Sequence, residues 1–298
     1  MKVTWLPDAE PRARRIAVGT FDGVHLGHRE VIRGADTVLT FDPHPLAVIA
    51  PHALPKLLDS LAIKRDLIAG LGVEELVVIP FDADFAAQSA EAFVRDVLIP
   101  ALGAERVAVG QNFRFGSKAR GDADMLRAHG EFETRVVPLV EVEGETVSSS
   151  HVRGLVAAGD VARAARFLGR PPMVEGEVVV GDQRGRELDM PTANLVPDDQ
   201  FATPGHGVYA AWAEVGGARH AAAVSIGVRP TFGTGRAPLV ESHILDFDGD
   251  LYGSTLRVAF VERLRGERRF ESAVDLMDQM RRDVELVRQI ASATVSRR

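Results

Sequence analysis

The chain has 298 residues, enough for two domains at about 150 residues each, and it contains no cysteine. Disulfides, zinc–thiolate sites and a cysteine nucleophile are therefore excluded, which is compatible with a reducing cytoplasm. The formal net charge of −7 argues against a nucleic-acid-binding module, and no apolar run is long enough to cross a membrane. We therefore expect a cytoplasmic protein that acts on small molecules.

The first strand is predicted at residues 16–18, after a short arginine-rich segment. Arg12, Arg14 and Arg15 precede the strand, and we interpret them as a solvated charge cluster. The stretch IAVGTFDGVHLGH then combines the strand, a glycine-bearing turn and a helix start. Backbone N–H groups at such a junction point toward an anion, which favours a phosphate site.

Two histidines add chemistry to this stretch. His25 and His28 are three residues apart, so on a helix they share one face, and Gly27 leaves room for a phosphate. Imidazoles that donate to phosphate oxygens suit a reaction in which charge moves onto a bridging oxygen. The alternative is that both rings are merely packed. The candidate phosphate-binding residues around them are Gly19, Thr20, Phe21, Asp22, Gly23 and Gly27.

Strands and helices alternate over the rest of the first half. Strands are predicted at residues 37–41, 73–80 and 105–110, with a helix over 60–72 that Gly72 caps and another that Ser89 caps. This alternation predicts a parallel, doubly wound α/β sheet. Asp42 ends the strand at 37–41, at the sheet edge where ligands bind in open α/β folds.

Two further polar segments follow in the first half. Asn112 and Arg114 come just after a strand, and aromatic residues flank Arg114, which indicates either a planar ligand or a loop anchored in the core. Ser149 and Ser150 precede a helix that carries Arg153 one turn in. Hydroxyls at a helix start cap it or bind phosphate, and the arginine favours phosphate.

The pattern changes near residue 168, where Gly169-Arg170-Pro171-Pro172 indicates a linker. Short β-rich runs separated by turns continue to about residue 265, which predicts an antiparallel barrel or sandwich. Apolar residues then recur at helical spacing at positions 270, 274, 277, 280, 284, 287 and 290. This predicts an amphipathic C-terminal helix packed on the barrel.

Candidate ligands lie between the strands of the second half. Gly181 and Gly185 belong to a polar loop suited to closing over phosphates. Thr192 and Asn194, in Pro-Thr-Ala-Asn, offer two neutral oxygen atoms of the kind that Mg²⁺ binds beside ATP phosphates, although a hairpin turn could have the same sequence. Glu241 is a candidate base for an attacking hydroxyl, or else a solvated strand carboxylate.

Taken together, these motifs resemble a known family over essentially the whole chain. GTFDGVHLGH, TFDPHP, GQNFRFG and the serine–arginine segment resemble the nucleotidylyltransferase half of the prokaryotic bifunctional riboflavin kinase and FMN adenylyltransferases, or FAD synthetases. PTANL, GVYA, SIGVRPTFG and ESHILDFDGDLYG resemble the riboflavin kinase half. The resemblance implies a Rossmann-like α/β nucleotidylyltransferase domain over residues 1–168 and an antiparallel β-barrel kinase domain with a C-terminal helix over residues 169–298.

The resemblance also implies reactions and roles. Riboflavin would be phosphorylated by ATP to FMN, and FMN would then be adenylylated by a second ATP to FAD, with release of pyrophosphate. Thr192 and Asn194 would hold Mg²⁺ with ATP, Glu241 would activate the ribityl hydroxyl, and Arg265 would lie near the flavin. In the first half, Ser149, Ser150 and Arg153 would bind the triphosphate, and Asp42, Asn112 and Arg114 would bind FMN. We expect a monomer, with transient self-association as the alternative.

Two departures from the family pattern keep alternatives open. The helix after His28 is shorter than usual, and Asp189 stands where the family usually has glycine. One half could therefore be inactive, leaving an adenylyltransferase joined to a flavin-binding module. A nucleotidylyltransferase for another phosphate-bearing acceptor is the other alternative.

Overall fold

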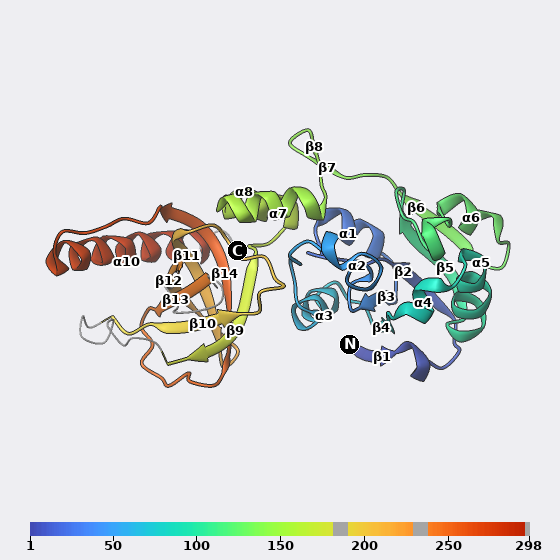
Figure 1. The fold of residues 1–298 in the computed structure, drawn as a ribbon, viewed down its shortest axis with the longest axis horizontal. Helices are drawn as coiled ribbons and strands as arrows, with labels where there is room; N and C mark the ends of the chain where they lie inside the picture. Colours follow the sequence, from blue (N-terminus) through green and yellow to red (C-terminus); the bar gives the residue numbers. More distant parts are fainter. Residues whose placement is uncertain (181–189, 229–237, 296–298) are drawn as a thin grey trace. The chain divides into compact units, whose positions relative to one another are not determined.

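The computed structural model describes residues 1–180, 190–228 and 238–295, and the chain forms two compact units. The first unit comprises residues 1–55 and 59–149, and the second comprises residues 56–58 and 150–298. Each unit contains one main sheet (Figure 1). The first is an α/β unit and the second a β-barrel unit.

The first unit is built on a six-stranded, all-parallel sheet in the order β1-β4-β3-β2-β5-β6. Its strands are β1 (Lys2–Trp5), β2 (Arg14–Val18), β3 (Thr37–Asp42), β4 (Glu75–Pro80), β5 (Ala104–Gly110) and β6 (Glu133–Val137). The predicted parallel α/β sheet is confirmed. The edge strands β1 and β6 were not predicted.

Helices cover both faces of this sheet, because successive strand residues point to opposite sides. Ile16 and Val18 pack with one set of helices, whereas Ala17 packs with α1 and α3 on the other face. The helices are α1 (Leu26–Ile32), α2 (Pro45–Ile49), α3 (Leu61–Ala69), α4 (Ala83–Ala87), α5 (Ala90–Ala92), the π-helix η3 (Phe93–Ala101) and α6 (Ala123–Ala128). Shorter elements are the 3₁₀ turns η1 (Leu6–Asp8), η2 (Pro51–Ala53) and η4 (Ser117–Ala119), and the hairpin β7 (Glu141–Val142) and β8 (Glu145–Thr146).

Two expectations about local structure in this unit were wrong. The helix predicted over 60–72 ends at Ala69 with Gly70 as its C-cap, because the next N–H groups, of Leu71 and Gly72, bond to carbonyls three residues back and Gly72 has a φ of +82°. Arg14 is not solvated: its side chain is 2% exposed and its Nε lies 3.0 Å from a carboxylate oxygen of Glu75, which is 4% exposed. This buried ion pair joins β2 to β4 at the end of the sheet where the strands begin.

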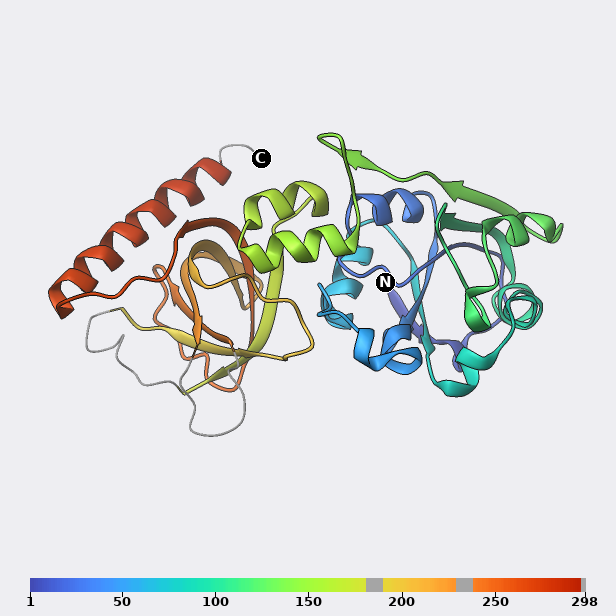
Figure 2. The same cartoon turned by 45° about the horizontal axis from the view of Figure 1, so that its top comes forward.

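The second unit is a closed barrel of six antiparallel strands in the order β10-β13-β12-β11-β14-β9 (Figure 2). The strands are β9 (Met173–Val179), β10 (Ala193–Pro197), β11 (Gly207–Val215), β12 (Ala218–Val228), β13 (Pro238–Ile244) and β14 (Thr255–Arg265). Two helices precede the barrel, α7 (Ser149–Ala158) and α8 (Val161–Leu168), and α10 (Ala273–Val295) follows it. The antiparallel barrel and the C-terminal helix are confirmed, whereas β10 was not predicted as a strand.

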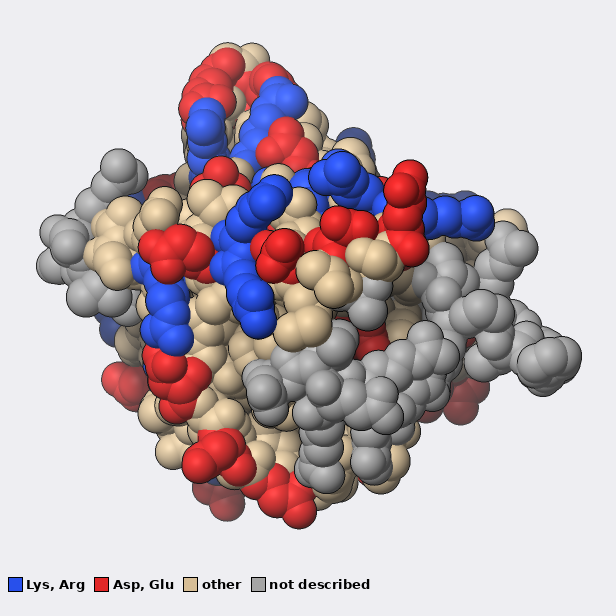
Figure 3. Space-filling view, turned by 90° about the vertical axis from the view of Figure 1, so that its left-hand side faces the viewer, with Lys and Arg blue, Asp and Glu red and all other residues tan. Residues whose placement is uncertain are grey.

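The apolar contacts of the helix α10 with the outside of the barrel lie in its second half. Val284, Val287 and Ile290 contact an apolar patch that includes Ala210 and Leu245. Val274 is 66% exposed, so the predicted apolar stripe does not face the barrel at the start of the helix. Figure 3 shows acidic and basic side chains interspersed over the described part of one face of this unit.

Candidate active sites in the two units

The loop between β2 and α1 holds the histidine pair at the carboxyl end of the parallel sheet. The rings of His25 and His28 are stacked, with centroids 3.5 Å apart and planes 14° apart. His25 is the N-cap of α1, and its Nδ1 accepts a hydrogen bond from the His28 N–H at 3.2 Å. This bond places the proton of a neutral His25 ring on Nε2. A Cβ at Gly27 would lie 3.3 Å from the His25 ring, so glycine lets the ring take this position.

His28 is prepared to act as a neutral imidazole. Burial, the neighbouring His25 and the positive charge of Lys64 lower the pKa of His28 well below its ordinary value. The edge of Phe21 meets its ring, with centroids 5.3 Å apart. Its Nδ1 is buried and has no hydrogen-bond partner among the described residues. An unpaired ring nitrogen is a costly feature in a native structure, and a ligand oxygen would satisfy it.

The backbone of the same loop adopts conformations that are rare for side-chain-bearing residues. Phe21 and Val24 have φ of +49° and +40°, and Gly23 has φ of +92°. Such left-handed residues orient neighbouring N–H groups into a concavity that binds anions. The carbonyls are held by other groups: the Thr20 oxygen accepts from Lys64 Nζ at 2.8 Å, and the Asp22 oxygen accepts from Ser149 Oγ at 2.9 Å.

The predicted FMN-binding residues lie at the carboxyl ends of β3 and β5, the two strands that flank β2 in the sheet. Asp42 is the last residue of β3, and Asn112 follows β5, so the sheet brings both to the edge that holds the histidines. Asn112 and Arg114 are exposed, and Arg114 Nη1 pairs with Asp122 at 2.9 Å. Phe115 is buried, so one flanking aromatic anchors the loop, while the ring of Phe113 stacks on it at 5.5 Å.

Ser150 and Arg153 belong to the second unit, where Arg153 Nη2 lies 3.1 Å from Ser150 Oγ. The prediction that they bind a triphosphate together with Ser149 stays a prediction. Lys64, in α3, was missed because a single lysine in an amphipathic helix gives no sequence signal. Its side chain is 8% exposed and lies among the charges of Asp22, Asp59 and Asp42.

In the barrel, strand register brings the predicted kinase residues into one row. Asn194 of β10 lies opposite Glu241 of β13, and Glu241 lies opposite Ser225 of β12. Ser225 lies opposite Val208 of β11, which lies opposite Arg265 of β14. Opposed residues of antiparallel strands point to the same side, so Asn194 and Glu241 are neighbours. Arg265 is three strands from Glu241, about 14 Å at ordinary strand spacing.

Two members of this row have contrasting surroundings. The Oδ1 of Asn194 is buried and has no hydrogen-bond partner among the described residues. Buried oxygen acceptors in folded proteins normally accept at least one hydrogen bond. Arg265 instead forms a close ion pair with Asp283 of α10 at 2.8 Å, and its guanidinium lies over the Phe270 ring. Arg265 therefore ties the barrel to its C-terminal helix.

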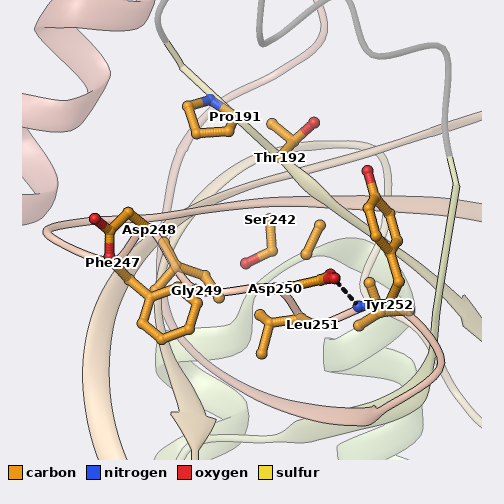
Figure 4. A pocket seen from close by; sticks show the side chains of 12 residues that line it. Pro191, Thr192, Ser242, Phe247, Asp248, Gly249, Asp250, Leu251 and Tyr252 are labelled. Atoms are coloured by element: carbon orange, nitrogen blue, oxygen red, sulfur yellow. Dashed lines mark hydrogen bonds between the residues drawn. The ribbon is translucent and has the colours of Figure 1, made fainter.

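A pocket of about 360 Å³ opens at the mouth of the barrel beside Thr192 (Figure 4). Ser242 contributes a fully buried hydroxyl that has no partner in the described part of the chain. Ser242 and the loop after it belong to the motif ESHILDFDGDLYG, of which only Glu241 was predicted as a site residue. The lining residues are Val178, Pro191, Thr192, Ala193, Ser242, Ile244, Phe247, Asp248, Gly249, Asp250, Leu251 and Tyr252.

Some expected features fall outside what the structure describes. Gly181, Gly185 and Asp189 lie in residues 181–189, which are outside the described residues. Within residues 1–180, 190–228 and 238–295, no group of three or more histidine, aspartate or glutamate side chains is arranged to hold a metal ion. No helix in these ranges has an apolar stretch sufficient to span a bilayer.

The folds and polar residues define a two-domain enzyme class: a nucleotide-transferring α/β unit joined to a barrel with a small-molecule pocket. Family comparisons agree, since residues 8–151 match the FAD synthetase family and residues 168–291 match the riboflavin kinase family. The chain belongs to the bifunctional riboflavin kinase/FMN adenylyltransferase family.

Relatives of that name cover nearly the full chain. The protein of Listeria monocytogenes is 35% identical over 90% of this chain and 89% of its own length. That of Pseudomonas fluorescens is 36% identical over 97% of this chain and 96% of its own length. Among solved structures, one from Streptococcus pneumoniae titled a macrolide-efflux protein aligns with a TM-score of 0.87 and 32% identity, covering 97% of this chain and 99% of that one.

Proposed function

We propose that this enzyme makes FMN from riboflavin and ATP in residues 169–298, and FAD from FMN and a second ATP in residues 1–168. The observation that carries the adenylyltransferase half is the stacked histidine pair, with the unpaired, buried Nδ1 of His28. The kinase half is carried by Asn194 and Glu241, which lie opposite each other on adjacent strands.

In adenylyl transfer, a phosphate oxygen of FMN attacks the α-phosphorus of ATP and pyrophosphate leaves. His25 and His28 stabilise the negative charge that develops on the phosphate oxygens, because the N–H group of a neutral imidazole donates a hydrogen bond to such an oxygen. The loop at Gly19, Thr20, Phe21, Asp22 and Gly23, with Gly27, cradles the ATP phosphates, and Ser149, Ser150 and Arg153 close on the triphosphate. Asp42, Asn112 and Arg114 hold FMN at the same sheet edge.

In the kinase reaction, Glu241 takes the proton of the ribityl hydroxyl while that oxygen attacks the γ-phosphorus of ATP, and ADP leaves as the bond to the bridging oxygen breaks. Thr192 and Asn194 would hold Mg²⁺, which supplies positive charge next to the phosphates. The unsatisfied buried oxygen of Asn194 fits an oxygen-preferring cation. The pocket bounded by Phe247 and Tyr252 accepts the nucleoside of ATP, and Ser242 offers it a hydroxyl.

The test follows the flavins by chromatography with riboflavin, excess ATP and Mg²⁺. Wild-type protein is expected to give FMN and then FAD. Glu241→Gln is expected to lower FMN formation by about 100-fold or more, with FAD formation from added FMN unchanged. Glu177→Gln, which alters an exposed barrel carboxylate, is the matched control.

Two further measurements separate the alternatives. Asn194→Leu is expected to raise the Mg²⁺ concentration needed for half-maximal kinase rate, whereas Asn194→Asp retains the requirement near the wild-type value. FAD from FMN without FMN from riboflavin would identify an adenylyltransferase joined to an inactive kinase half. Adenylylation of another phosphate ester in preference to FMN would overturn the proposed acceptor. The monomeric state and the cytoplasmic location stay predictions, which sedimentation and cell fractionation address.

A further inference from the structure

Lys64 is the most deeply buried cation near the histidine pair, and the mechanism above does not use it. Its ammonium group donates to the Thr20 carbonyl at 2.8 Å, across 44 positions of the chain. The Thr40 hydroxyl donates to the same carbonyl at 3.2 Å. Thus α3 and β3 both fasten the first residue of the strained loop that leads to His25 and His28.

The charges around Lys64 come from three separate segments. Asp22 lies in the loop, Asp42 ends β3 and Asp59 immediately precedes the Ser60 N-cap of α3. Asp22 and Asp59 are each 3% exposed. Without a cation, such buried carboxylates would oppose the negative charge that builds up on the phosphate oxygens in the transition state, because charges in a poorly solvated site interact strongly. Lys64 neutralises part of this acidic group.

We propose that Lys64 is a positioning residue for adenylyl transfer: it fixes the loop through the Thr20 carbonyl and supplies the buried positive charge beside the histidine pair. This inference rests on the proposed adenylyltransferase function of the first unit. Lys64 acts through the loop and through the charge of its neighbours, so its loss affects turnover more than ATP binding.

The same geometry predicts an effect on acid sensitivity. The charged groups that act on His28 are His25 and Lys64, and both lower the pKa of His28 in addition to burial. Burial lowers the pKa of Lys64 itself, and the negative charges of Asp22, Asp59 and Asp42 oppose this lowering. Removing the lysine charge therefore raises the pKa of His28 toward its ordinary value, so His28 becomes protonated at a higher pH.

The experiment compares Lys64→Met, Lys64→Gln and Lys64→Arg in FAD formation from FMN, over a range of pH. Lys64→Met is expected to lower kcat by about 100-fold with little change in KM for ATP, as for a displaced catalytic group. The acid limb of its pH–rate profile moves to higher pH. Lys64→Arg, which keeps the positive charge, is expected to retain most of the wild-type kcat and to have the acid limb of its pH–rate profile at the wild-type pH.

Controls distinguish a specific effect from general damage. Arg65→Met removes an exposed charge from the next position of the same helix and is expected to leave the rate unchanged. Riboflavin phosphorylation by the same preparations measures the second unit. Lys64→Gln can still donate to Thr20, so it tests the charge alone if the methionine variant does not fold.

Wild-type rates in Lys64→Met or Lys64→Gln would overturn the inference. The inference would also be overturned if Lys64→Arg, Lys64→Met and Lys64→Gln lost equal amounts of kcat and the acid limb of the pH–rate profile did not move. That pattern would mean that Lys64 contributes only through its packing. Absence of FAD formation in the wild-type protein would instead overturn the proposed function, which keeps the two failures distinct.

Discussion

A single imidazole illustrates how the first unit prepares its chemistry at the scale of one residue. The His28 ring is half-buried between Phe21 and His25, next to a lysine, and these surroundings disfavour its charged form. The motif predicts both histidines and their shared helix face. It does not predict the depressed pKa of His28, because this depends on burial and in part on Lys64, which comes from a helix 36 positions further along.

We expect His28→Ala to lower FAD formation from FMN by at least about 100-fold, the ordinary contribution of a group that stabilises or transfers charge. Phosphorylation of riboflavin is expected to continue, because the barrel has its own polar residues. His52→Ala, which removes an exposed histidine of the same unit, is the control. A comparable loss of FAD formation in His28→Ala and His52→Ala would show that the loss comes from destabilised protein and not from the missing catalytic ring.

At the scale of elements, apolar runs and their spacing predict the central strands well, and the edge strands poorly. Residues 16–18 and 76–79 are continuous apolar runs, as expected for parallel strands buried on both faces. The edge strand β1 is Lys-Val-Thr-Trp, with only Thr4 buried, so its pattern resembles a loop. Its place depends on the Thr4 hydroxyl, which donates to Glu75 at 2.7 Å. No local pattern encodes a contact across 71 positions.

Glu75 is the centre of that contact and should control the acid stability of the first unit. Burial raises its pKa, but hydrogen bonds from Thr4, Arg14 and Arg12 and the charge of Arg14 outweigh this, so the net pKa is lowered. A lowered carboxyl pKa stabilises the fold above the unfolded pKa, and this contribution is lost as pH falls through the folded pKa.

Glu75→Gln is therefore expected to lower the free energy of unfolding at pH 7 by about 3 kcal/mol, because it leaves Arg14 without its buried partner. The difference from wild type should begin to shrink as the pH falls below the unfolded carboxyl pKa of about 4.3, and it should disappear below the lowered pKa of the folded carboxyl. Fluorescence of Trp5, read in a Trp212→Phe background, follows the first unit during urea unfolding. The adjacent, exposed Glu74→Gln is the control, and an equal effect there would contradict the role of the ion pair.

In the second unit, the sequence correctly predicts the C-terminal helix but not how it is held. Asp283 is 5% exposed and pairs with Arg265, so we expect Asp283→Asn and Arg265→Met to destabilise the barrel by similar amounts, about 3 kcal/mol. Trp212 fluorescence in a Trp5→Phe background measures this.

Arg288→Met breaks the exposed pair with Asp246 and should change stability by less than about 1 kcal/mol. If Arg265→Met abolished kinase turnover without loss of stability, Arg265 would act on the flavin instead.

At the scale of the whole molecule, the α/β unit and the barrel unit have separate hydrophobic cores. An equimolar mixture of His28→Ala and Glu241→Gln proteins is therefore expected to convert riboflavin to FAD, although each variant alone stops early. Chromatography of FMN and FAD over time follows the exchange. The rate of FAD formation should rise with total protein and with added FMN. A mixture that accumulates FMN and never forms FAD would show that FMN cannot pass between molecules.

Closure of the barrel has a consequence for behaviour at high concentration. A closed ring of strands has no unpaired edge that could template the addition of a strand from another molecule, whereas an open sheet has two. In the first unit one of these edges is β1, four residues long and bearing Lys2, both of which discourage such addition. Loss of Glu75 would loosen β1 and uncover the apolar β4 beneath it. Aggregation of destabilised variants should therefore begin in the α/β unit.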